Sequence, residues 1–222
     1  MVANGPEMAL VKVALLGYGE LGRYMRSVLD EYLSVDWESS VFFDDAYQSS
    51  GGVNGFTFPE HTDARFADHR FYVCLGYKHL ATKAAIVARL VELGREVPSF
   101  VHPTSWVHPS VKLGHGAFLY PGVNIDRHSE VGDATWLSNG TIIAHDSVVG
   151  AGCWFGASVT LCGKVRVGSR TFLGSGSVVS NDVTVGDDVV VGLSTAVTKP
   201  VADGASVIGN PMRVLEKKIT LL

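Results

Sequence analysis

The chain has 222 residues, of which 46% are hydrophobic and 18% charged, and its net charge is −4. This length and composition are typical of one large or two small folded domains, and they exclude an intrinsically disordered chain. The acidic balance argues against nucleic acid as a partner, and no apolar run is long enough to cross a membrane.

The N-terminal residues lack the basic start and apolar core of a secretory signal. The three cysteines, Cys74, Cys153 and Cys162, form no C-x-x-C pair, which argues against a disulfide framework and against a zinc cage. We therefore expect a soluble, reduced, cytoplasmic protein without a membrane partner.

The first part of the chain alternates between strand-like and helix-like segments. Apolar runs of strand length occur at residues 10–17, 40–45, 71–76 and 99–103. Helical patterns lie between them, the longest from residue 78 to residue 94. This alternation predicts an α/β domain with a parallel sheet, Rossmann-like and mononucleotide-binding, over residues 1–101.

A glycine loop, Gly17-x-Gly19-x-x-Gly22, follows the first predicted strand and precedes a helix. The pattern is typical of loops that hold a diphosphate at a helix N-terminus. Asp44 lies 22 residues after Gly22, a separation that suits a ribose contact. Because a domain of this size is only one mononucleotide-binding half, the pattern favours a nucleoside diphosphate ligand over a dinucleotide. A purely structural turn is the alternative.

In the second part of the chain an apolar residue recurs at every sixth position without a slip. The sixteen positions are Val107, Leu113, Leu119, Ile125, Val131, Leu137, Ile143, Val149, Phe155, Leu161, Val167, Leu173, Val179, Val185, Val191 and Val197. A period of six fits neither a helix nor a flat strand. It is typical of a parallel β-helix, in which six residues make one short strand and one corner.

Glycines repeat with a longer period of 18 residues, as at Gly114, Gly132 and Gly150. Eighteen residues are three hexapeptides, so we expect a three-sided prism of about five coils over residues 102–222. Glycine is expected at a recurring corner because the turn requires either a positive φ or a close backbone approach.

Aromatic residues also recur every 18 residues, which predicts a column along one edge of the prism. Its members are Phe100, Phe118, Trp136, Trp154 and Phe172. One interpretation is that the column is buried against a neighbouring subunit. The other is that part of it lines a ligand groove between subunits.

His145 and the adjacent Asp146 occupy positions of one hexapeptide that point away from the prism core. A surface histidine can be inert, but a neighbouring acid can orient the ring and raise its basicity. Gly163 lies one coil further on, where its N–H could face a developing oxyanion. We therefore interpret His145 as a candidate general base.

A zinc site is the alternative use of these histidines. His115, His128 and His145 are separated by 13 and 17 residues, which are not multiples of the 18-residue coil. They are not expected to stack, so we expect no metal.

Four motifs together carry a family resemblance: the glycine loop at 17–22, V-H-P at 101–103, the H-D pair at 145–146 and G-N-P-x-R at 209–213. With the hexapeptide repeat, the chain resembles the sialic acid O-acetyltransferase family of sugar acyltransferases. Well-understood members N-acetylate nucleotide-linked 4-amino sugars, as in bacterial bacillosamine and perosamine synthesis. The resemblance implies a left-handed parallel β-helix, acetyl-CoA as co-substrate and a homotrimer with active sites between subunits.

The resemblance also implies roles for individual residues. His145 would be the general base, Asp146 its partner, and Gly163 would bind the acetyl carbonyl through its amide. The residues implied in acetyl-CoA binding are Trp154, Gly163, Ser175 and Leu193. The residues implied in nucleotide-sugar binding are Gly17, Gly19, Glu20, Leu21, Asp44, Asp45, Leu75, Gly76 and Lys78.

The chain departs from the family pattern at Leu21 and Trp154, where related sugar N-acetyltransferases carry histidines. The expected activity is direct transfer of acetyl from acetyl-CoA to a nucleotide-linked amino sugar, for surface glycans such as lipopolysaccharide O-antigen. O-acetylation of a sugar hydroxyl is the first alternative. A non-catalytic trimeric scaffold that binds nucleotide sugars is the second.

Overall fold

The computed structural model describes residues 10–46, 54–217 and 219–220. The N-terminal residues on which the expected absence of a secretory signal rests lie mostly outside this described part. The chain divides into two compact units, Met1–Gly76 with Arg89–Pro98, and Tyr77–Ala88 with Ser99–Leu222.

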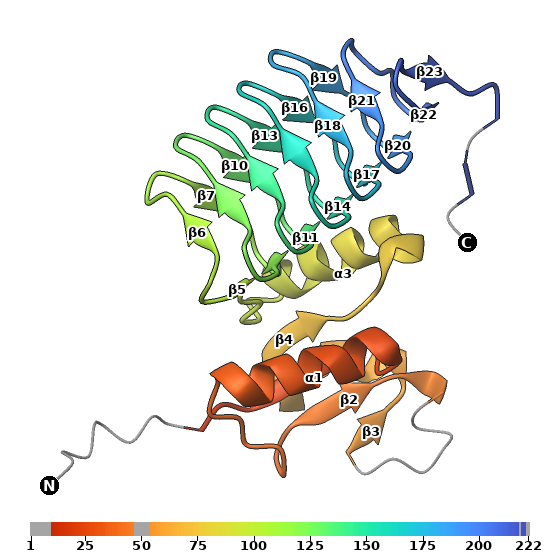
Figure 1. Ribbon diagram of the computed structural model, residues 1–222. Helices are drawn as coiled ribbons and strands as arrows, with labels where there is room; N and C mark the ends of the chain where they lie inside the picture. The colour runs from red at the N-terminus through yellow and green to blue at the C-terminus, as the bar shows by residue number, and fades with distance from the viewer. Residues whose placement is uncertain (1–9, 47–53, 218, 221–222) are drawn as a thin grey trace, which may run out of the picture. The chain divides into compact units, whose positions relative to one another are not determined.

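The first unit contains a four-stranded parallel sheet with the order β3-β2-β1-β4 (Figure 1). Its strands are β1 (Val13–Leu16), β2 (Val41–Phe43), β3 (Gly55–Phe56) and β4 (Arg70–Val73). Strands β1 and β2 are buried throughout, as expected of parallel strands covered on both faces. The predicted parallel sheet is confirmed for the strands expected at 10–17, 40–45 and 71–76, whereas the two-residue strand β3 was not predicted. The strand expected at 99–103 does not join this sheet, because Phe100–Val101 pairs with the β-helix instead.

Helices connect these strands. Helix α1 (Glu20–Tyr32) follows β1, and two short 3-10 helices, η1 (Phe58–Thr62) and η2 (Ala64–Phe66), precede β4. A further 3-10 turn, η3 (Tyr77–His79), leads into α3 (Leu80–Glu92). The α3 helix ends at Glu92, and Gly94, two residues later, has a φ of +69° that allows the Arg95 N–H to donate to the Leu90 carbonyl.

The second unit contains three parallel sheets that form the sides of a β-helix (Figure 1). The six-stranded sheet comprises β6 (Trp106–Val107), β9 (Asn124–Ile125), β12 (Ile142–Ile143), β15 (Thr160–Leu161), β18 (Val178–Val179) and β21 (Ala196–Val197). The five-stranded sheet comprises β7 (Lys112–Leu113), β10 (Glu130–Val131), β13 (Val148–Val149), β16 (Arg166–Val167) and β19 (Thr184–Val185).

The third side is an eight-stranded sheet. It comprises β5 (Phe100–Val101), β8 (Phe118–Leu119), β11 (Trp136–Leu137), β14 (Trp154–Phe155), β17 (Phe172–Leu173), β20 (Val190–Val191), β22 (Ser206–Ile208) and β23 (Arg213–Val214). All its pairings are parallel except the last, where β23 runs antiparallel to β22.

Strands of successive coils pair with an offset of 18 residues, as in Trp136 with Trp154 and Ile142 with Thr160. The predicted coil of three hexapeptides is therefore confirmed. The second residue of each short strand from β8 to β21 is buried inside the prism. Of the sixteen predicted core positions, fourteen are buried, and Val107 and Leu113 in the first coil pack partly buried against the same core.

The recurring glycine corner is explained by close backbone approach. A Cβ added to Gly132 would lie 2.7 Å from the backbone nitrogen of Ala151 in the next coil. No real Cβ tolerates such a contact, so a side chain there would push the coils apart. Positive φ values occur at other corner positions, including Asp146 and Ser158.

The aromatic column forms as predicted, with ring centroids 4.4 Å apart for Phe118 and Trp136 and 4.9 Å apart for Trp136 and Trp154. No neighbouring subunit is needed to bury the first members of the column. Phe118 and Trp136 are buried within one chain, and Tyr77 from η3 packs against Trp154. The start of α3 lies across this sheet, with Lys83 positioned over the Trp154 ring.

Candidate active site

His145 and Asp146 lie at the corner between β12 and β13, on the surface of the β-helix. The His145 Nδ1 atom lies 2.8 Å from Asp146 Oδ2, and each side chain is about half exposed. Asp146 has a φ of +58°, in the left-handed region that aspartate tolerates better than most residues. The turn of the corner therefore sets the carboxylate beside the ring.

The charge state of the pair follows from this geometry. The hydrogen bond from His145 lowers the pKa of the Asp146 carboxyl, burial opposes this shift, and the positive charge of Lys164 acts in the same direction as the hydrogen bond. Asp146 is thus ionised at neutral pH. An ionised carboxylate accepts the Nδ1 proton, which leaves Nε2 of a neutral imidazole as a proton acceptor.

Gly163 lies directly against this imidazole. A Cβ at position 163 would be 2.8 Å from His145 Nε2 and 2.9 Å from its Cε1 atom. The predicted stacking of the two residues one coil apart is therefore seen. The Gly163 N–H, however, donates to Asn181 Oδ1 at 2.8 Å, a contact absent from the sequence analysis. Asn181 is one further step of 18 residues along the same corner, so the coil period could have revealed it.

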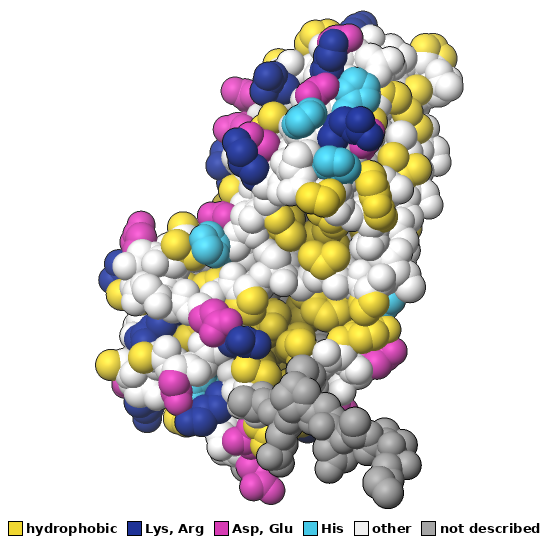
Figure 2. Space-filling model, turned by 90° about the vertical axis from the view of Figure 1, so that its left-hand side faces the viewer, with side chains coloured by type: hydrophobic (Ala, Val, Ile, Leu, Met, Phe, Trp, Pro, Cys, Tyr) yellow, Lys and Arg dark blue, Asp and Glu magenta, His cyan; other side chains and the backbone are white. Residues whose placement is uncertain are grey.

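Histidine side chains gather with basic and acidic ones on part of the surface in Figure 2. Among the described residues, no group of histidine, cysteine, aspartate and glutamate side chains is arranged to hold a metal ion. In the same part of the chain, no helix is both long and apolar enough to span a membrane.

Ser175 and Leu193 lie on a different corner from His145. They follow β17 and β20 and precede strands of the six-stranded sheet, so they lie at its opposite edge. Leu193 is 70% exposed. Residues of this corner are mostly small, including Ser158 and Gly176, and the corner presents backbone to solvent. One chain therefore does not bring these residues together with His145.

Trp154 belongs to the eight-stranded sheet rather than to the His145 corner. Its ring is parallel to that of Trp136 within 3° and packs against Tyr77 at 5.7 Å. The Lys83 Nζ atom lies 5.3 Å from its centroid. The side chain implied in acetyl-CoA binding is thus also part of the aromatic column, and its role in binding stays a prediction.

The glycine loop of the first unit connects β1 to the start of α1. Gly17 has a φ of +88°, and a Cβ at Gly22 would collide with the Gly17 carbonyl oxygen. Around Gly19, by contrast, no atom would lie within 4 Å of an added Cβ. Gly19 is also the N-cap of α1 and provides no side-chain cap. The first and third glycines are therefore needed for packing, whereas the second leaves open space at a helix N-terminus.

The ends of three neighbouring strands meet at this loop. After β2, Asp44 Oδ2 accepts a hydrogen bond from the Tyr18 N–H at 2.6 Å. After β4, Leu75 lies beside Gly17, with its Cδ2 3.2 Å from a Cβ built there. Residues predicted to bind the nucleotide sugar are thus brought together at the carboxyl ends of parallel strands, where ligands bind in open α/β sheets.

Four other residues predicted for the sugar site, Glu20, Leu21, Asp45 and Gly76, belong to the same unit. Glu20 is exposed and Leu21 half-buried in the first turn of α1. The Asp45 Oδ1 atom accepts a hydrogen bond from the Phe58 N–H at 2.9 Å. Gly76 has no atom within 4 Å of an added Cβ.

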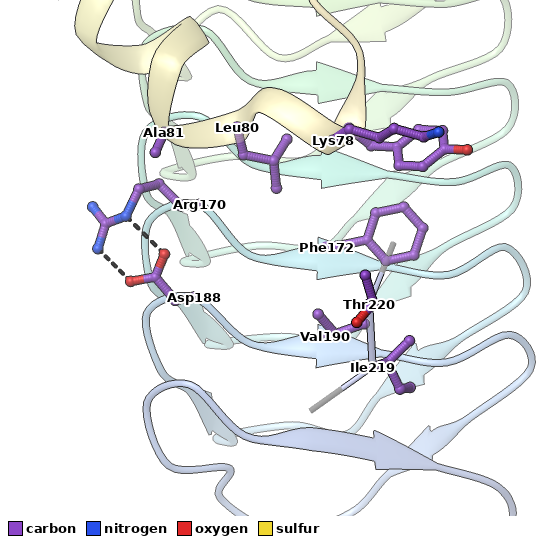
Figure 3. Close-up of a pocket in the computed structure, with 10 residues that line it drawn as sticks. Lys78, Leu80, Ala81, Arg170, Phe172, Asp188, Val190, Ile219 and Thr220 are labelled. Atoms are coloured by element: carbon purple, nitrogen blue, oxygen red, sulfur yellow. Dashed lines mark hydrogen bonds and ion pairs between the residues drawn. The ribbon is translucent and has the colours of Figure 1, made fainter. Parts of the chain in front are cut away.

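Lys78 lines a cavity of about 310 Å³ in the second unit (Figure 3). Tyr77, Leu80 and Phe172 provide apolar and aromatic walls. Arg170 and Asp188 form an ion pair of 2.7 Å at its side. Sequence reasoning did not reveal this cavity, because its walls come from η3, two strands of the β-helix and the C-terminal segment.

No protein-family model matches the chain, and no curated protein matches its sequence. Solved structures match over nearly the whole chain. PerB from Caulobacter crescentus, in complex with CoA and GDP-perosamine, is 29% identical over 93% of this chain and 98% of that chain, with a TM-score of 0.80. A variant of the Caulobacter crescentus perosamine N-acetyltransferase is 28% identical over 94% and 99%, also with a TM-score of 0.80.

The acetyltransferase domain of PglB from Neisseria gonorrhoeae FA1090 is 23% identical over 92% of this chain and 99% of that chain, with a TM-score of 0.81. Its structure has also been solved with acetyl coenzyme A. At this identity the match shows a shared fold alone. The structural neighbours are hexapeptide-repeat sugar acetyltransferases. The resemblance predicted from the sequence is thereby confirmed, and these acetyltransferases have been solved with CoA or acetyl-CoA bound.

Proposed function

We propose that this protein is an acetyl-CoA-dependent N-acetyltransferase acting on a nucleotide-linked amino sugar, of the 4-amino-4,6-dideoxy type used in bacterial surface glycans. The observation that carries the proposal is the His145–Asp146 pair set against Gly163. It lies on a β-helix whose neighbour of 29% identity binds CoA and GDP-perosamine over almost the same length of chain.

The chemistry needs only groups that this corner supplies. His145 Nε2 takes a proton from the sugar amine as the amine nitrogen bonds to the thioester carbonyl carbon. Asp146 holds the imidazole in the required tautomer. A backbone N–H at Gly163 would stabilise the negative charge on the carbonyl oxygen. The carbon–sulfur bond then breaks, the proton passes to the departing thiolate, and no acyl-enzyme forms.

The first unit supplies the means to hold the nucleotide. Its strand order β3-β2-β1-β4 matches the core of a Rossmann-like fold. The open space at Gly19 beside the start of α1 suits a diphosphate. We therefore infer that this loop holds the nucleoside diphosphate of the acceptor, and that the β-helix is left-handed, as the family resemblance implies.

A homotrimer would complete the active site. The eight-stranded face is covered by the chain itself, and the five-stranded face carries charged residues such as Lys112, Glu130 and Arg166. The outward positions of the six-stranded face are uncharged. Three of them are large, apolar and exposed: Trp106 by 49%, Ile142 by 45% and Val178 by 40%.

Packing the six-stranded faces around a threefold axis would bury these side chains. The same packing would place the His145 corner of one protomer beside the Ser175 and Leu193 corner of its neighbour, because these corners are opposite edges of that face. The groove between protomers would then hold acetyl-CoA.

The test combines an acceptor panel with one substitution. Wild-type protein and acetyl-CoA are mixed with UDP-, dTDP- and GDP-linked amino sugars, and thiol release and product mass are followed. We expect turnover with one amino sugar and a loss of about 10²–10⁴-fold in His145→Ala. His115→Ala, an exposed histidine on another corner, is the matched control and should keep wild-type activity.

Each other outcome points to one alternative. A product that mild alkali hydrolyses would be an ester and would indicate O-acetylation. Full activity in His145→Ala would contradict the assignment of the base. Binding of nucleotide sugars with no acetyl-CoA binding would favour the non-catalytic scaffold.

A further inference from the structure

The Gly163 amide that the mechanism assigns to the acyl carbonyl already has a hydrogen-bond partner. Asn181, at the corner between β18 and β19, accepts this N–H through Oδ1 at 2.8 Å. A Cβ built on Gly163 would lie 3.4 Å from the same oxygen, and it would also contact the His145 ring. An N–H donor can serve a carbonyl oxygen only after Asn181 releases it.

Other corners of the β-helix contain the same kind of hydrogen bond with a different acceptor. Asp133 accepts the His115 N–H at 2.7 Å, and Asp187 accepts the Ser169 N–H at 2.7 Å. In each pair the acceptor lies 18 residues after the donor. Aspartate is therefore compatible with this corner geometry, and the neutral amide beside His145 is not required by the fold.

The neutral side chain has a chemical consequence at this corner. A carboxylate would bind the N–H by a charge-assisted hydrogen bond, which is about twice as strong as a neutral one. It would also place a negative charge where the thioester oxygen becomes negative during the reaction. Asparagine avoids both effects. Asn181 is also an exposed residue, so its side chain has solvent beside it.

We propose that Asn181 is a positioning residue that occupies the Gly163 amide in the resting site and yields it to the acyl carbonyl of the donor. This inference rests on the proposed function, because it takes Gly163 as the group that binds that carbonyl. Asn181 keeps the amide satisfied and its peptide plane oriented until the carbonyl oxygen replaces the side-chain oxygen.

The experiment compares acetyl-CoA with CoA, which lacks the acyl carbonyl. Dissociation constants are measured by calorimetry for the wild type, Asn181→Asp, Asn181→Ala and the control Asp133→Asn. We expect the ratio of the acetyl-CoA constant to the CoA constant to rise about tenfold in Asn181→Asp, since a stronger acceptor must be displaced. In Asn181→Ala, where nothing is displaced, the ratio should fall about threefold.

Two further readouts separate positioning from a structural role. The penalty in Asn181→Asp should shrink as the pH falls and the new carboxyl becomes protonated, and Asp133→Asn should leave the ratio unchanged. An unchanged ratio in both Asn181 variants, with the wild type binding acetyl-CoA, would overturn this inference alone. A wild type that binds neither ligand would overturn the proposed function and this inference with it.

Discussion

At the scale of single residues, the position of Gly163 is explained by its neighbour rather than by its backbone conformation. The contact that a Cβ would make is with the imidazole of His145, an exposed and movable side chain. At Gly132 the corresponding contact is with backbone nitrogen of the next coil. The same substitution should therefore affect activity at one position and stability at the other.

We expect Gly163→Ala to lower kcat/KM by at least about tenfold, because the methyl group pushes Nε2 away from the acceptor amine. Its midpoint of thermal unfolding should stay close to that of the wild type, since only a surface side chain must shift. Gly132→Ala should instead unfold at a lower temperature. Steady-state kinetics and thermal scans of both variants check this, and an active Gly163→Ala would contradict the placement of the base.

Asp146→Asn isolates the charge of the second residue. Asparagine also tolerates the left-handed backbone at this position, so the corner should keep its shape. The variant no longer presents an ionised acceptor to Nδ1, and we expect kcat to fall about tenfold to a hundredfold with the unfolding temperature nearly unchanged. A kcat equal to that of the wild type would show that the carboxylate does not assist the imidazole.

The candidate site was predictable from sequence where its residues share a repeat position. His145 and Gly163 are one coil apart, so the period alone brings them together. The partner of the Gly163 amide was not predicted, because spacing indicates which residues stack but not which backbone groups their side chains bind. The cavity beside Lys78 was not predicted either, since its walls come from distant segments.

At the scale of elements, helix α3 carries a lysine into an apolar contact. Lys83 is 2% exposed, and its Nζ atom has no hydrogen-bond partner in the described part of the chain. Burial lowers the pKa of this amine to about 7, and the nearby Cys153 opposes the shift only weakly. The face of Trp154 beneath it offers a cation–π contact to the charged form.

This burial predicts a pH dependence of stability. The pKa of Lys83 is about 7 in the folded chain and near 10.4 when unfolded, so the unfolded chain holds the extra proton between these values. The free energy of unfolding should therefore rise with pH in this window and fall as the pH drops towards 7.

The variant Lys83→Met has no amine at this position, so its stability does not depend on this proton. From pH 7 to pH 8.5, the wild type should gain about 1.5 kcal/mol relative to the variant. Denaturant unfolding of both proteins at several pH values provides the measurement. Parallel curves for the two proteins would contradict a neutral buried amine.

The sequence pattern predicted the elements well but not their contacts. The 18-residue repeat of Phe118, Trp136 and Trp154 correctly indicated a column on one face. The residues that cover the column belong to helix α3, which is remote in sequence. Lys83 is a polar residue of that helix at a buried position, so the apolar pattern did not indicate that this side of the helix is packed. Strand β3 has two residues and, unlike the strands of the β-helix, belongs to no repeat, so no periodic signal indicated it.

At the scale of the whole molecule, assembly should depend on the uncharged six-stranded face. Ile142→Glu combined with Val178→Glu places two charges on that face, and we expect dissociation to monomers with at least a hundredfold loss of activity. Sedimentation velocity and kinetics measure both effects.

Thr184→Glu, on the charged five-stranded face, is the matched control and should remain assembled. A wild-type protein that sediments as a monomer would argue against the proposed site between protomers.

The β-helix itself was predictable because the hexapeptide register runs without an insertion from Val107 to Val197. A period of six admits few other structures, and the core positions follow directly from it. The first unit was harder to delimit, because residues of the α3 segment are divided between the two compact units. Alternating patterns predict helices and strands, but they do not indicate against which compact unit a helix such as α3 packs.

The antiparallel strand β23 has a consequence for growth of the β-helix. A stack of parallel coils ends in unpaired backbone groups that could template a further chain, as in fibrils. Because β23 reverses direction against β22, the eight-stranded sheet no longer offers the next coil a parallel edge. We therefore expect deletion of residues from 213 onward to leave this edge of β22 unpaired and to favour end-to-end association, which light scattering would detect.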